Sequence, residues 1–528
     1  MTDRPLGAQI SHMLKSRGVE VIFGIPGVHN QEMYRGIEEA GLTHVLARHE
    51  QGAGFMADGY ARATGKPGVA YVITGPGLCN IMTPMGQAYS DSVPMLVISS
   101  CLNRADLGMG RGRLHEMKDQ EIAAGTVCDW SLTAMDAASA YQLIDRALSE
   151  FATGRKRPKH IQVPIEVLEA LALAAPEPMS LATTGYVPYD VTDIVFDAVE
   201  KAQRPLFVFG GGAREGATVW RDVVKAAGAA SFVTYAGMGI IAEGGLHFGS
   251  SLARPGSVDV IASADLVVAV GTELSETDLW RDDLGHTGTF IRIDIDADEL
   301  NDTPATHRIH ADAGQVAKEL WAKRGDWSDK SGWTEAEVAK TREKWRAEVT
   351  SERPGIPQVA DALRAALPDD TVIYSDMTQF AYAALEIWPM NRPNQWHHPC
   401  GFGTLGYALP SAIGGALARK GKPTIAIAGD YGFQYTLQEL MVAVELELCL
   451  PIILWDNGKL GEIEDSMVAA QIAPNAVIQR NPDFVKFAEA FGAASAAPKS
   501  LDELQDVVRE ALKTKGPTLI YVRSEIAA

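Results

Sequence analysis

The sequence has few cysteines. Its 528 residues contain five of them, and no two form a C-x-x-C pair. This scatter excludes a disulfide framework and argues against a zinc site, and it is typical of reduced thiols in a cytoplasmic protein. We therefore expect a cytoplasmic location. The five are Cys79, Cys101, Cys128, Cys400 and Cys449.

Positive charge and long apolar runs are also scarce. The chain has 47 basic and 67 acidic residues, a net charge of −20, which argues against a general affinity for nucleic acid or anionic membranes. No apolar run reaches the roughly 18 residues needed to span a bilayer. The N-terminal "MTDRPLGAQISHML" lacks the apolar stretch of a secretion signal. We expect no nucleic-acid partner and no membrane association.

Short apolar strands instead alternate with helical patterns along most of the chain. "VEVIFGIPG", "ADLVVAVGTEL" and "PTIAIAGD" are examples. Near-continuous apolar strands separated by helices predict parallel sheets covered on both faces, an α/β fold with three doubly wound domains. Two polar or Ala/Pro-rich stretches, 171–187 and 324–356, read as linkers. We predict domains at 1–170, 188–323 and 357–528.

A lone carboxylate stands at the end of one predicted strand. Asp430 follows the apolar run "TIAIAG", and Asn457 follows the next strand, "PIILWD", after 26 intervening residues. Ligands bind at the carboxyl ends of such strands, and carboxylate, amide and carbonyl oxygens suit Mg²⁺ or Ca²⁺. A helix beginning after Asp430 adds N–H donors for phosphate. Further along, Thr436 and Glu439 have the spacing of a capping box.

These residues carry a resemblance to a family. Gly429-Asp430, 26 residues and Asn457 resemble the metal–diphosphate motif of thiamine diphosphate enzymes, with Tyr431 where the family usually has Gly. "RHEQGAGFMADGYARATGKPGV" and "GFGTLGYALPSAIGGALA" are similar to stretches of acetolactate synthases and 2-oxo acid decarboxylases. The resemblance covers nearly the whole chain. It implies a pyrimidine-binding N-terminal domain, a Rossmann-like central domain and a diphosphate-binding C-terminal domain.

The resemblance also assigns roles to individual residues. Glu50 is expected to hydrogen-bond N1′ of the aminopyrimidine, so that the 4′-nitrogen can take the proton from C2 of the thiazolium. Leu405 is expected to bend the cofactor, and Gly403 to accept from the 4′-amine. The metal ligands implied are Asp430, Asn457 and the carbonyl of Lys459. The other cofactor-binding residues implied are Pro26, Gly27, Gly75, Asn80, Thr378, Gln379, Gly429, Tyr431, Gly432, Leu460 and Gly461.

Histidines near the site are candidate proton carriers. His29 follows "GIPGV" and His115 lies in "GRLHEMKDQ", and imidazole titrates near neutrality. Because the pyrimidine and diphosphate ends bind to different domains, the resemblance implies active sites at a subunit interface, in a dimer or a dimer of dimers.

Three functions compete at this stage. The first is decarboxylation of a 2-oxo acid through a carbanion/enamine on C2, the second an acetolactate synthase-type ligation of pyruvate, and the third a non-catalytic thiamine-binding or regulatory relative. Retention of Glu50, Asp430 and Asn457 weighs against the third. "TDLWRDDLG" replaces the flavin-contacting "RFDDR" stretch, so we do not expect FAD. The motifs together most resemble 5-guanidino-2-oxopentanoate decarboxylases.

The substrate pocket is expected to include Val28, Gln120, Glu462 and Ile463. In the family, the fifth and sixth residues after the metal-binding Asn face the substrate, and here these are Glu462 and Ile463. A carboxylate in a partly desolvated pocket needs a cationic partner, and a guanidinium matches it in two parallel hydrogen bonds. We therefore predict that Glu462 selects a guanidinium-bearing substrate. The alternative is that it pairs with a Lys or Arg of the protein or simply meets solvent.

Overall fold

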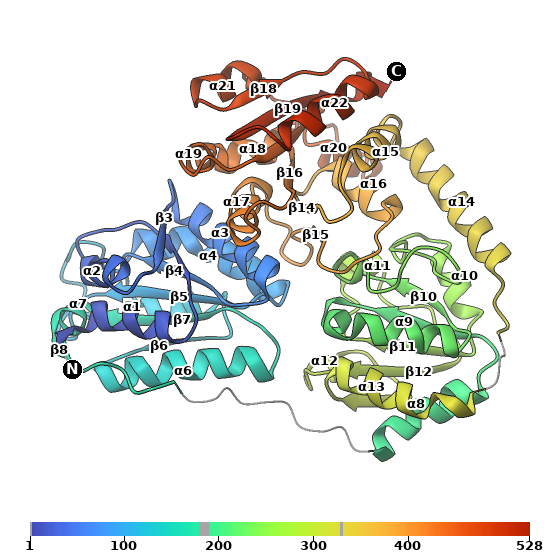
Figure 1. Cartoon of the computed structure of the whole chain (residues 1–528), viewed down its shortest axis with the longest axis horizontal. Coiled ribbons are helices and arrows are strands. Elements are labelled where there is room, and N and C mark those ends of the chain that lie inside the picture. The colour runs from blue at the N-terminus through green and yellow to red at the C-terminus, as the bar shows by residue number, and fades with distance from the viewer. Residues whose placement is uncertain (1–2, 179–188, 328–330, 528) are drawn as a thin grey trace.

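The computed structural model describes residues 3–178, 189–327 and 331–527. They fold into three parallel α/β sheets, each flanked by helices, which confirms the predicted fold class (Figure 1). Each sheet lies within one predicted domain. The part of the first linker at 179–187, the start of the central domain at 188 and residues 328–330 of the second linker lie outside the described residues. The domain boundaries stay a prediction.

The N-terminal sheet has six parallel strands in the order β3-β2-β4-β5-β7-β6. The strands are β2 (Val21–Gly24), β3 (Thr43–Leu46), β4 (Gly68–Val72), β5 (Met95–Cys101), β6 (Trp130–Thr133) and β7 (Lys159–Pro164). The helices are α1 (Leu6–Ser16), α2 (Gln31–Glu39), α3 (Glu50–Thr64), α4 (Pro76–Ser90), α5 (Gln120–Gly125), α6 (Ala137–Thr153) and α7 (Ile165–Glu169). A short antiparallel pair joins β1 (Arg4–Pro5) to β8 (Leu171–Ala172). The central strands β4 and β5 are buried throughout, as expected of a sheet covered on both faces.

The central sheet has five parallel strands in the order β10-β9-β11-β12-β13. They are β9 (Pro205–Phe209), β10 (Ala230–Val233), β11 (Leu266–Val270), β12 (Thr289–Asp294) and β13 (His307–His310). The helices are α8 (Tyr189–Lys201), α9 (Ala217–Ala226), α10 (Ser257–Ala262), α11 (Glu276–Leu279), α12 (Glu299–Asp302) and α13 (Ala313–Lys323). The second predicted linker contains α14 (Glu335–Glu352), which runs between the central and C-terminal domains (Figure 1). It is anchored by buried Val338, Trp345 and Val349.

The C-terminal sheet has six parallel strands in the order β15-β14-β16-β17-β19-β18. They are β14 (Val372–Ser375), β15 (Trp396–His397), β16 (Thr424–Gly429), β17 (Leu450–Asp456), β18 (Ala494–Ala496) and β19 (Pro517–Arg523). The helices are α15 (Ile356–Ala366), α16 (Gln379–Ile387), α17 (Ala408–Ala418), α18 (Asp430–Thr436), α19 (Leu440–Glu445), α20 (Gly461–Ala469), α21 (Phe484–Ala490) and α22 (Leu501–Ala511).

The capping-box prediction at Thr436 is wrong. Helix α18 already begins at Asp430, and the Thr436 side chain donates to the carbonyl of Gly406 at 2.8 Å instead of capping a helix. The Glu439 carboxylate accepts from the backbone N–H of Arg48 in the N-terminal domain. Both side chains are therefore used in tertiary contacts, which local spacing does not reveal.

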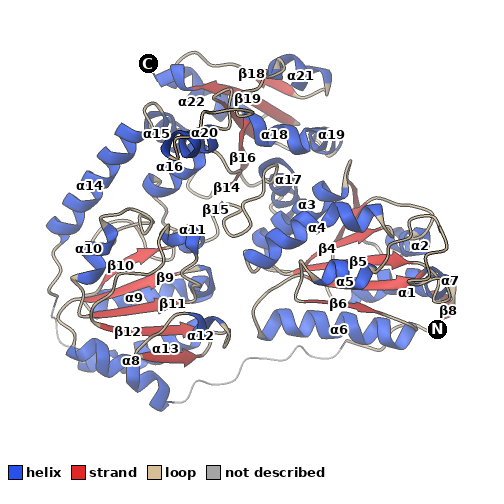
Figure 2. Ribbon diagram, turned by 180° about the vertical axis from the view of Figure 1, so that it is seen from behind, coloured by secondary structure: helices blue, strands red, loops and turns tan. Residues whose placement is uncertain are grey.

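The N- and C-terminal domains pack through helices α3 and α17, which lie side by side in both views (Figure 2). Glycines make the close approach possible. A Cβ at Gly59 would overlap the carbonyl of Ser411, and a Cβ at Gly414 would overlap that of Met56. Helix α3 is the helix that begins with Glu50, so this contact joins a predicted catalytic element to the C-terminal domain. None of the helices in the described ranges is long and apolar enough to cross a bilayer.

Candidate active site

The predicted site residues of the N-terminal domain follow the carboxyl ends of its strands. Pro26 to His29 follow β2, Glu50 follows β3, and Gly75 and Asn80 follow β4. The fold therefore brings these separate segments to one edge of the sheet, as parallel strands require.

Glu50 is the first residue of α3 and is buried, with 8% of its surface exposed. The preceding residue, His49, caps the helix by accepting from the backbone N–H of Gln51 at 3.1 Å. Asn80 donates its amide to Glu50 Oε2 at 2.9 Å. The other oxygen, Oε1, lies beside Gly77, where an added Cβ would be 3.2 Å away. The structure thus brings Glu50 and Asn80 together and keeps the space next to Oε1 clear.

The two candidate histidines also lie together. The rings of His29 and His115 meet edge to face, with centroids 5.1 Å apart. Burial, followed by the neighbouring His115, lowers the pKa of His29. The Nδ1 atoms of both rings are buried without a hydrogen-bond partner in the described structure, so each has polar capacity left for a ligand. His115 has a left-handed backbone (φ 63°) and packs against Gly75.

Two residues predicted for the substrate pocket on this side have different surroundings. Val28 is exposed by 61% at the tip of its loop. Gln120 is buried, and its amide is fully engaged inside the domain. Its Oε1 accepts from the N–H of Gly75 at 3.0 Å, and its Nε2 donates to the Ser100 carbonyl at 2.8 Å and to Gln162 at 2.9 Å. These bonds hold the loop that carries Gly75.

The diphosphate end is built on three neighbouring strands. Thr378 and Gln379 follow β14, Asp430 follows β16, and Asn457 follows β17. Strands β16 and β17 pair in parallel with Gly429 opposite Trp455, so Asp430 and Asn457 stand at adjacent strand ends, as predicted from the sequence. Gly429 lies against the side chain of Thr378, so the ends of strands β14 and β16 are in contact.

Asn457 is oriented by its neighbours. Its amide donates to Gln379 Oε1 at 3.0 Å, and its Oδ1 accepts from the N–H of Lys459 at 3.2 Å. Gly461 lies directly against Gln379, and no larger residue would fit there without displacing it. Leu460 is fixed by its N–H, which donates to the Val477 carbonyl at 2.8 Å. Gln379, predicted to contact the diphosphate, is thus tied to the predicted metal ligand.

Asp430 is buried, with 2% of its surface exposed. It lies close to Asp456, which is also buried, and both carboxylates contact the same amide of Asn481. Burial, and then the charge of Asp456, raises the pKa of Asp430. The described partners of these two carboxylates are neutral groups, from Asn481, Gly458 and Tyr521. Two adjacent buried carboxylates without a cation among the described partners are costly, so the residues present fit a bound divalent cation. No cluster of three or more His, Cys, Asp or Glu suited to a metal occurs in the described ranges.

Leu405 lies on a loop that is held on both sides. Thr404 donates its hydroxyl to Gln87 Oε1 of the N-terminal domain at 2.8 Å. Gly406 donates its N–H to Asp376 Oδ2 at 2.9 Å. Burial raises the pKa of Asp376 to about 7, and Gly432 packs against the same carboxylate. Gly403 precedes this loop with a left-handed backbone (φ 66°).

Glu462 already has a guanidinium partner in the chain. Arg353 donates to Glu462 Oε1 at 2.7 Å and to Asp465 Oδ2 at 3.1 Å. Arg353 ends helix α14, so it reaches this position from the segment between the central and C-terminal domains. Ile463, beside Glu462, is exposed by 50%. Among the sequence readings of Glu462, the structure displays the pairing with an Arg of the protein.

Sequence reasoning missed several polar residues here. Asp376 and Asp456 could have been found, since each stands at the end of an apolar strand beside a predicted site residue. Four more polar residues reach the site from distant elements, and no local pattern assigns them to it: Gln87, Arg353, Asn481 and Glu439, whose local spacing suggested a helix cap instead.

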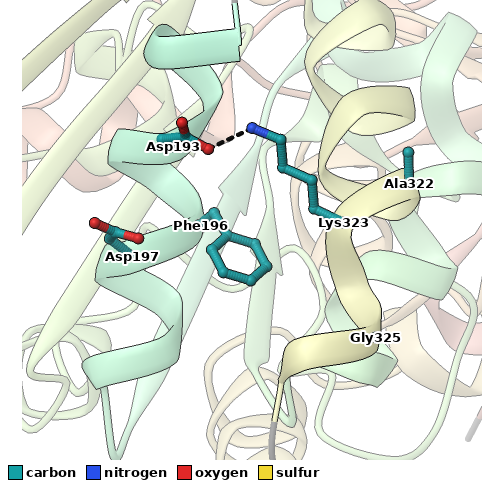
Figure 3. Close-up of a pocket in the computed structure, with 6 residues that line it drawn as sticks. All are labelled: Asp193, Phe196, Asp197, Ala322, Lys323 and Gly325. Carbon is teal, nitrogen blue, oxygen red and sulfur yellow. Dashed lines mark hydrogen bonds and ion pairs between the residues drawn. The ribbon is translucent and has the colours of Figure 1, made fainter.

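A cavity of about 580 Å³ lies away from these residues, between α8 and α13 of the central domain (Figure 3). Lys323 pairs there with Asp193. None of the residues lining this cavity belongs to the predicted site. They are Asp193, Phe196, Asp197, Ala322, Lys323 and Gly325.

Comparison with known proteins identifies the family of the three domains. Three family models match: the thiamine pyrophosphate enzyme N-terminal TPP-binding domain over residues 4–122, the central domain over 192–320, and the C-terminal TPP-binding domain over 376–522. The chain belongs to the thiamine pyrophosphate enzymes. The N-terminal match includes Glu50 and Asn80, and the C-terminal match includes Asp430 and Asn457.

Full-length relatives place the chain within this family. It is 41% identical to a protein of Pseudomonas aeruginosa described as a probable 2-ketoarginine decarboxylase, over 99% of this chain and 94% of the relative. It is 27% identical to the large subunit of acetolactate synthase isozyme 1 of Escherichia coli, over 97% and 93% of the two chains. It is 26% identical to the mitochondrial acetolactate synthase catalytic subunit of Saccharomyces cerevisiae, over 98% and 80%.

Proposed function

We propose that the protein is a thiamine diphosphate- and Mg²⁺-dependent decarboxylase of a 2-oxo acid with a basic side chain, such as 5-guanidino-2-oxopentanoate. The observation that carries the proposal is the presence of two groups in one chain, a buried Glu50 bonded to Asn80 and the adjacent strand ends with Asp430 and Asn457. This chain is 41% identical to a probable 2-ketoarginine decarboxylase. Acetolactate synthases are more distant relatives, which favours decarboxylation over ligation.

Different residues of the chain would bind the cation, the diphosphate and the pyrimidine and would carry protons. Thiamine diphosphate, when bound, supplies the thiazolium C2 nucleophile and the electron sink for decarboxylation. Asp430, Asn457 and the Lys459 carbonyl would hold the cation, and Thr378 and the Gly429–Gly432 turn would lie along the diphosphate. Glu50 would hold a proton at the pyrimidine, where its buried carboxylate, fixed by Asn80, is shielded from water. His29 or His115 would carry a proton to or from the substrate.

The substrate class has support beyond the relative's name. Glu462 and Asp465 bind a guanidinium, that of Arg353, so this pair of carboxylates has the geometry for the group that 5-guanidino-2-oxopentanoate carries. A substrate guanidinium would compete with Arg353 for Glu462, while Asp465 keeps the arginine.

The assembly and location are also part of the proposal. Exposed apolar side chains at Val28, Ile463, Val468 and Ile478 support burial in a dimer or a dimer of dimers. The five cysteines are unpaired, which supports a cytoplasmic location. Light scattering after size-exclusion chromatography tests the assembly, since a monomer at working concentration would refute it.

Release of CO₂ tests the function. The protein is supplied with thiamine diphosphate and Mg²⁺ and assayed with pyruvate, benzoylformate, 2-oxoglutarate and 5-guanidino-2-oxopentanoate, and the organic products are identified. We expect the highest kcat/KM for the guanidino acid, with the aldehyde as product. Acetolactate formed from pyruvate as the main product would favour the ligase instead, and no turnover of any 2-oxo acid would contradict both.

A further inference from the structure

The side chain of Asn481 lies between the two buried carboxylates of the predicted metal site. Its Nδ2 is 2.6 Å from Asp430 Oδ2 and 2.9 Å from Asp456 Oδ1. A primary amide has two N–H hydrogens, so one group can donate to both acids. The orientation of the amide is set from behind, because its Oδ1 accepts from Gln479 Nε2 at 2.9 Å and from Gln434 Nε2 at 3.2 Å.

The two carboxylates are not equivalent in this network. Asp456 is bonded on both oxygens: Oδ1 also accepts from the N–H of Gly458 at 2.8 Å, and Oδ2 accepts from the Tyr521 hydroxyl at 2.5 Å. In Asp430, the amide of Asn481 engages Oδ2 and not Oδ1, so Asn481 does not occupy the second oxygen of this carboxylate. The network thus makes Asp430 the ligand and Asp456 a fixed neighbour that shares the amide.

The backbone links Asn481 to the third predicted ligand. Lys459, whose carbonyl is expected to bind the cation, forms an antiparallel bridge with Ile478, and Leu460 bonds to Val477. Asn481 follows this bridge by three residues. The loop after β17 and the segment 477–481 therefore form one unit that holds both a carbonyl ligand and the donor to Asp430.

We propose that Asn481 is a positioning residue of the metal site, which turns Asp430 toward the cation and, by donating to both acids, offsets the repulsion between Asp430 and Asp456. The inference rests on the proposed metal–diphosphate site and deepens it. Groups that hydrogen-bond a ligating carboxylate orient it, and their loss typically lowers metal affinity about 10- to 100-fold. Nothing in the local sequence "IQRNPDF" points to such a role.

Calorimetric titration of thiamine diphosphate at a series of Mg²⁺ concentrations tests the proposal. The variants are Asn481→Leu, which keeps the size and removes the donors, and Asn481→Ala, which removes both. Asn475→Leu is the matched control, because Asn475 is an exposed asparagine just before this segment. We expect both Asn481 variants to need about 10- to 100-fold more Mg²⁺ for half-maximal cofactor binding, and saturating Mg²⁺ to restore it. The control should behave as the wild type.

Wild-type Mg²⁺ dependence in Asn481→Leu would overturn the proposal, whatever Asn481→Ala does, because it would show that the side chain only fills space. If circular dichroism shows that neither variant folds, Gln479→Leu, which removes one donor to the Asn481 oxygen, must still raise the Mg²⁺ requirement. Cofactor binding by the wild type that is unchanged by a chelator would instead refute the metal site itself, a failure distinct from that of Asn481.

Discussion

At the scale of single residues, Glu462 has two competing roles: it binds the substrate, or it forms a structural ion pair with Arg353. Its carboxylate is bound by the guanidinium of Arg353, which also contacts Asp465. The pair is partly exposed, with 36% of the Glu462 side chain and 29% of the Arg353 side chain accessible. Water therefore weakens this ion pair. Replacing the Arg353 guanidinium by that of a substrate would cost little electrostatic free energy.

Two substitutions separate a substrate role from a structural one. Glu462→Gln removes a charge-assisted contact worth about 1.5–3 kcal/mol, so kcat/KM for 5-guanidino-2-oxopentanoate should fall about 10- to 150-fold. Arg353→Gln removes the internal competitor, so kcat/KM for the same substrate should hold or rise. Steady-state kinetics with an uncharged straight-chain 2-oxo acid is the control, and its kcat/KM should change little in either variant. Equal losses on all substrates in both variants would show that the ion pair is structural.

At the scale of elements, the start of helix α3 is held by the C-terminal domain. Glu439, the last residue of the short 3₁₀ helix Leu437–Glu439, is fully buried, and its two oxygens accept from the N–H of Arg48 at 3.2 and 3.1 Å. Gly52, on the first turn of α3, has no side chain and so admits this carboxylate. Glu439 therefore fixes the backbone two residues before Glu50.

This contact predicts a dependence of stability on pH. Burial raises the pKa of Glu439 to about 7 from its ordinary value of 4.5. The folded state then binds the proton more tightly than the unfolded state. The resulting stabilisation is full below about pH 4.5 and is lost as the pH rises through 7, by up to about 3 kcal/mol. Thermal unfolding from pH 5 to 8 should show a steeper loss of Tm in the wild type than in Glu439→Gln. Parallel pH profiles for the two proteins would contradict this.

The site divides into parts that sequence can and cannot predict. Asp430 and Asn457 were predictable because parallel strands align their carboxyl ends, so apolar runs followed by polar residues mark the site. The three sheets were predictable for the same reason. Asn481, Glu439 and Arg353 were not, because each reaches the site through tertiary packing and follows no strand that marks it. Thr436 shows the reverse error, a local capping pattern overridden by a contact with Gly406.

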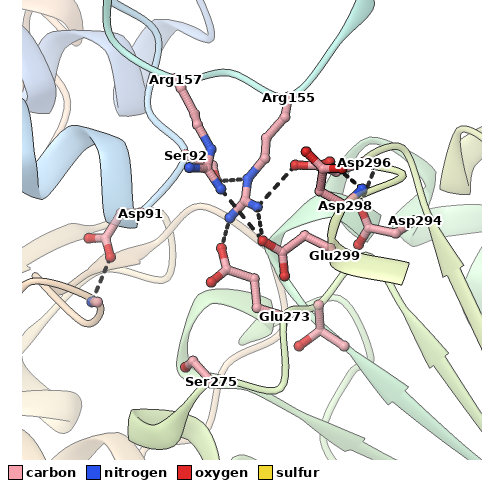
Figure 4. A network of polar contacts seen from close by, with 12 residues as sticks. Asp91, Ser92, Arg155, Arg157, Glu273, Ser275, Asp294, Asp296, Asp298 and Glu299 are labelled. Carbon is pink, nitrogen blue, oxygen red and sulfur yellow. Dashed lines mark hydrogen bonds and ion pairs between the residues drawn. The ribbon is translucent and has the colours of Figure 1, made fainter. Parts of the chain in front are cut away.

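At the scale of the whole molecule, charged contacts join the N-terminal and central domains. Arg155 contacts Glu273, Asp296 and Glu299 of the central domain, and its Nε donates to Ser92 at 2.8 Å (Figure 4). These acids follow strands β11 and β12, at the carboxyl edge of the central sheet. The acidic edge is thus covered by a cationic residue of the neighbouring domain.

Loss of Arg155 should weaken the packing of these domains. Arg155→Met removes the cation of Glu273 and Asp296 and leaves Glu299 only its longer contact with Arg157, at 3.5 Å. The substitution should cost about 1.5–3 kcal/mol, the usual worth of a hydrogen bond to a charged group. Lys156→Met is the matched control: it breaks an exposed pair with Glu215 and should cost less than about 1 kcal/mol. Differential scanning calorimetry measures both. Equal Tm values for the two variants would refute the role of Arg155.

Exchange of the C2 proton of bound thiamine diphosphate for deuterium tests most directly whether this chain activates the cofactor through Glu50. The wild type with Mg²⁺ should exchange the proton faster than free thiamine diphosphate. Glu50→Gln should bind the cofactor yet exchange and turn over about 10²- to 10⁴-fold more slowly, the usual range for loss of a positioned acid–base group. Exchange in Glu50→Gln as fast as in the wild type would contradict the assignment, and wild-type exchange no faster than in solution would contradict the proposed enzyme activity.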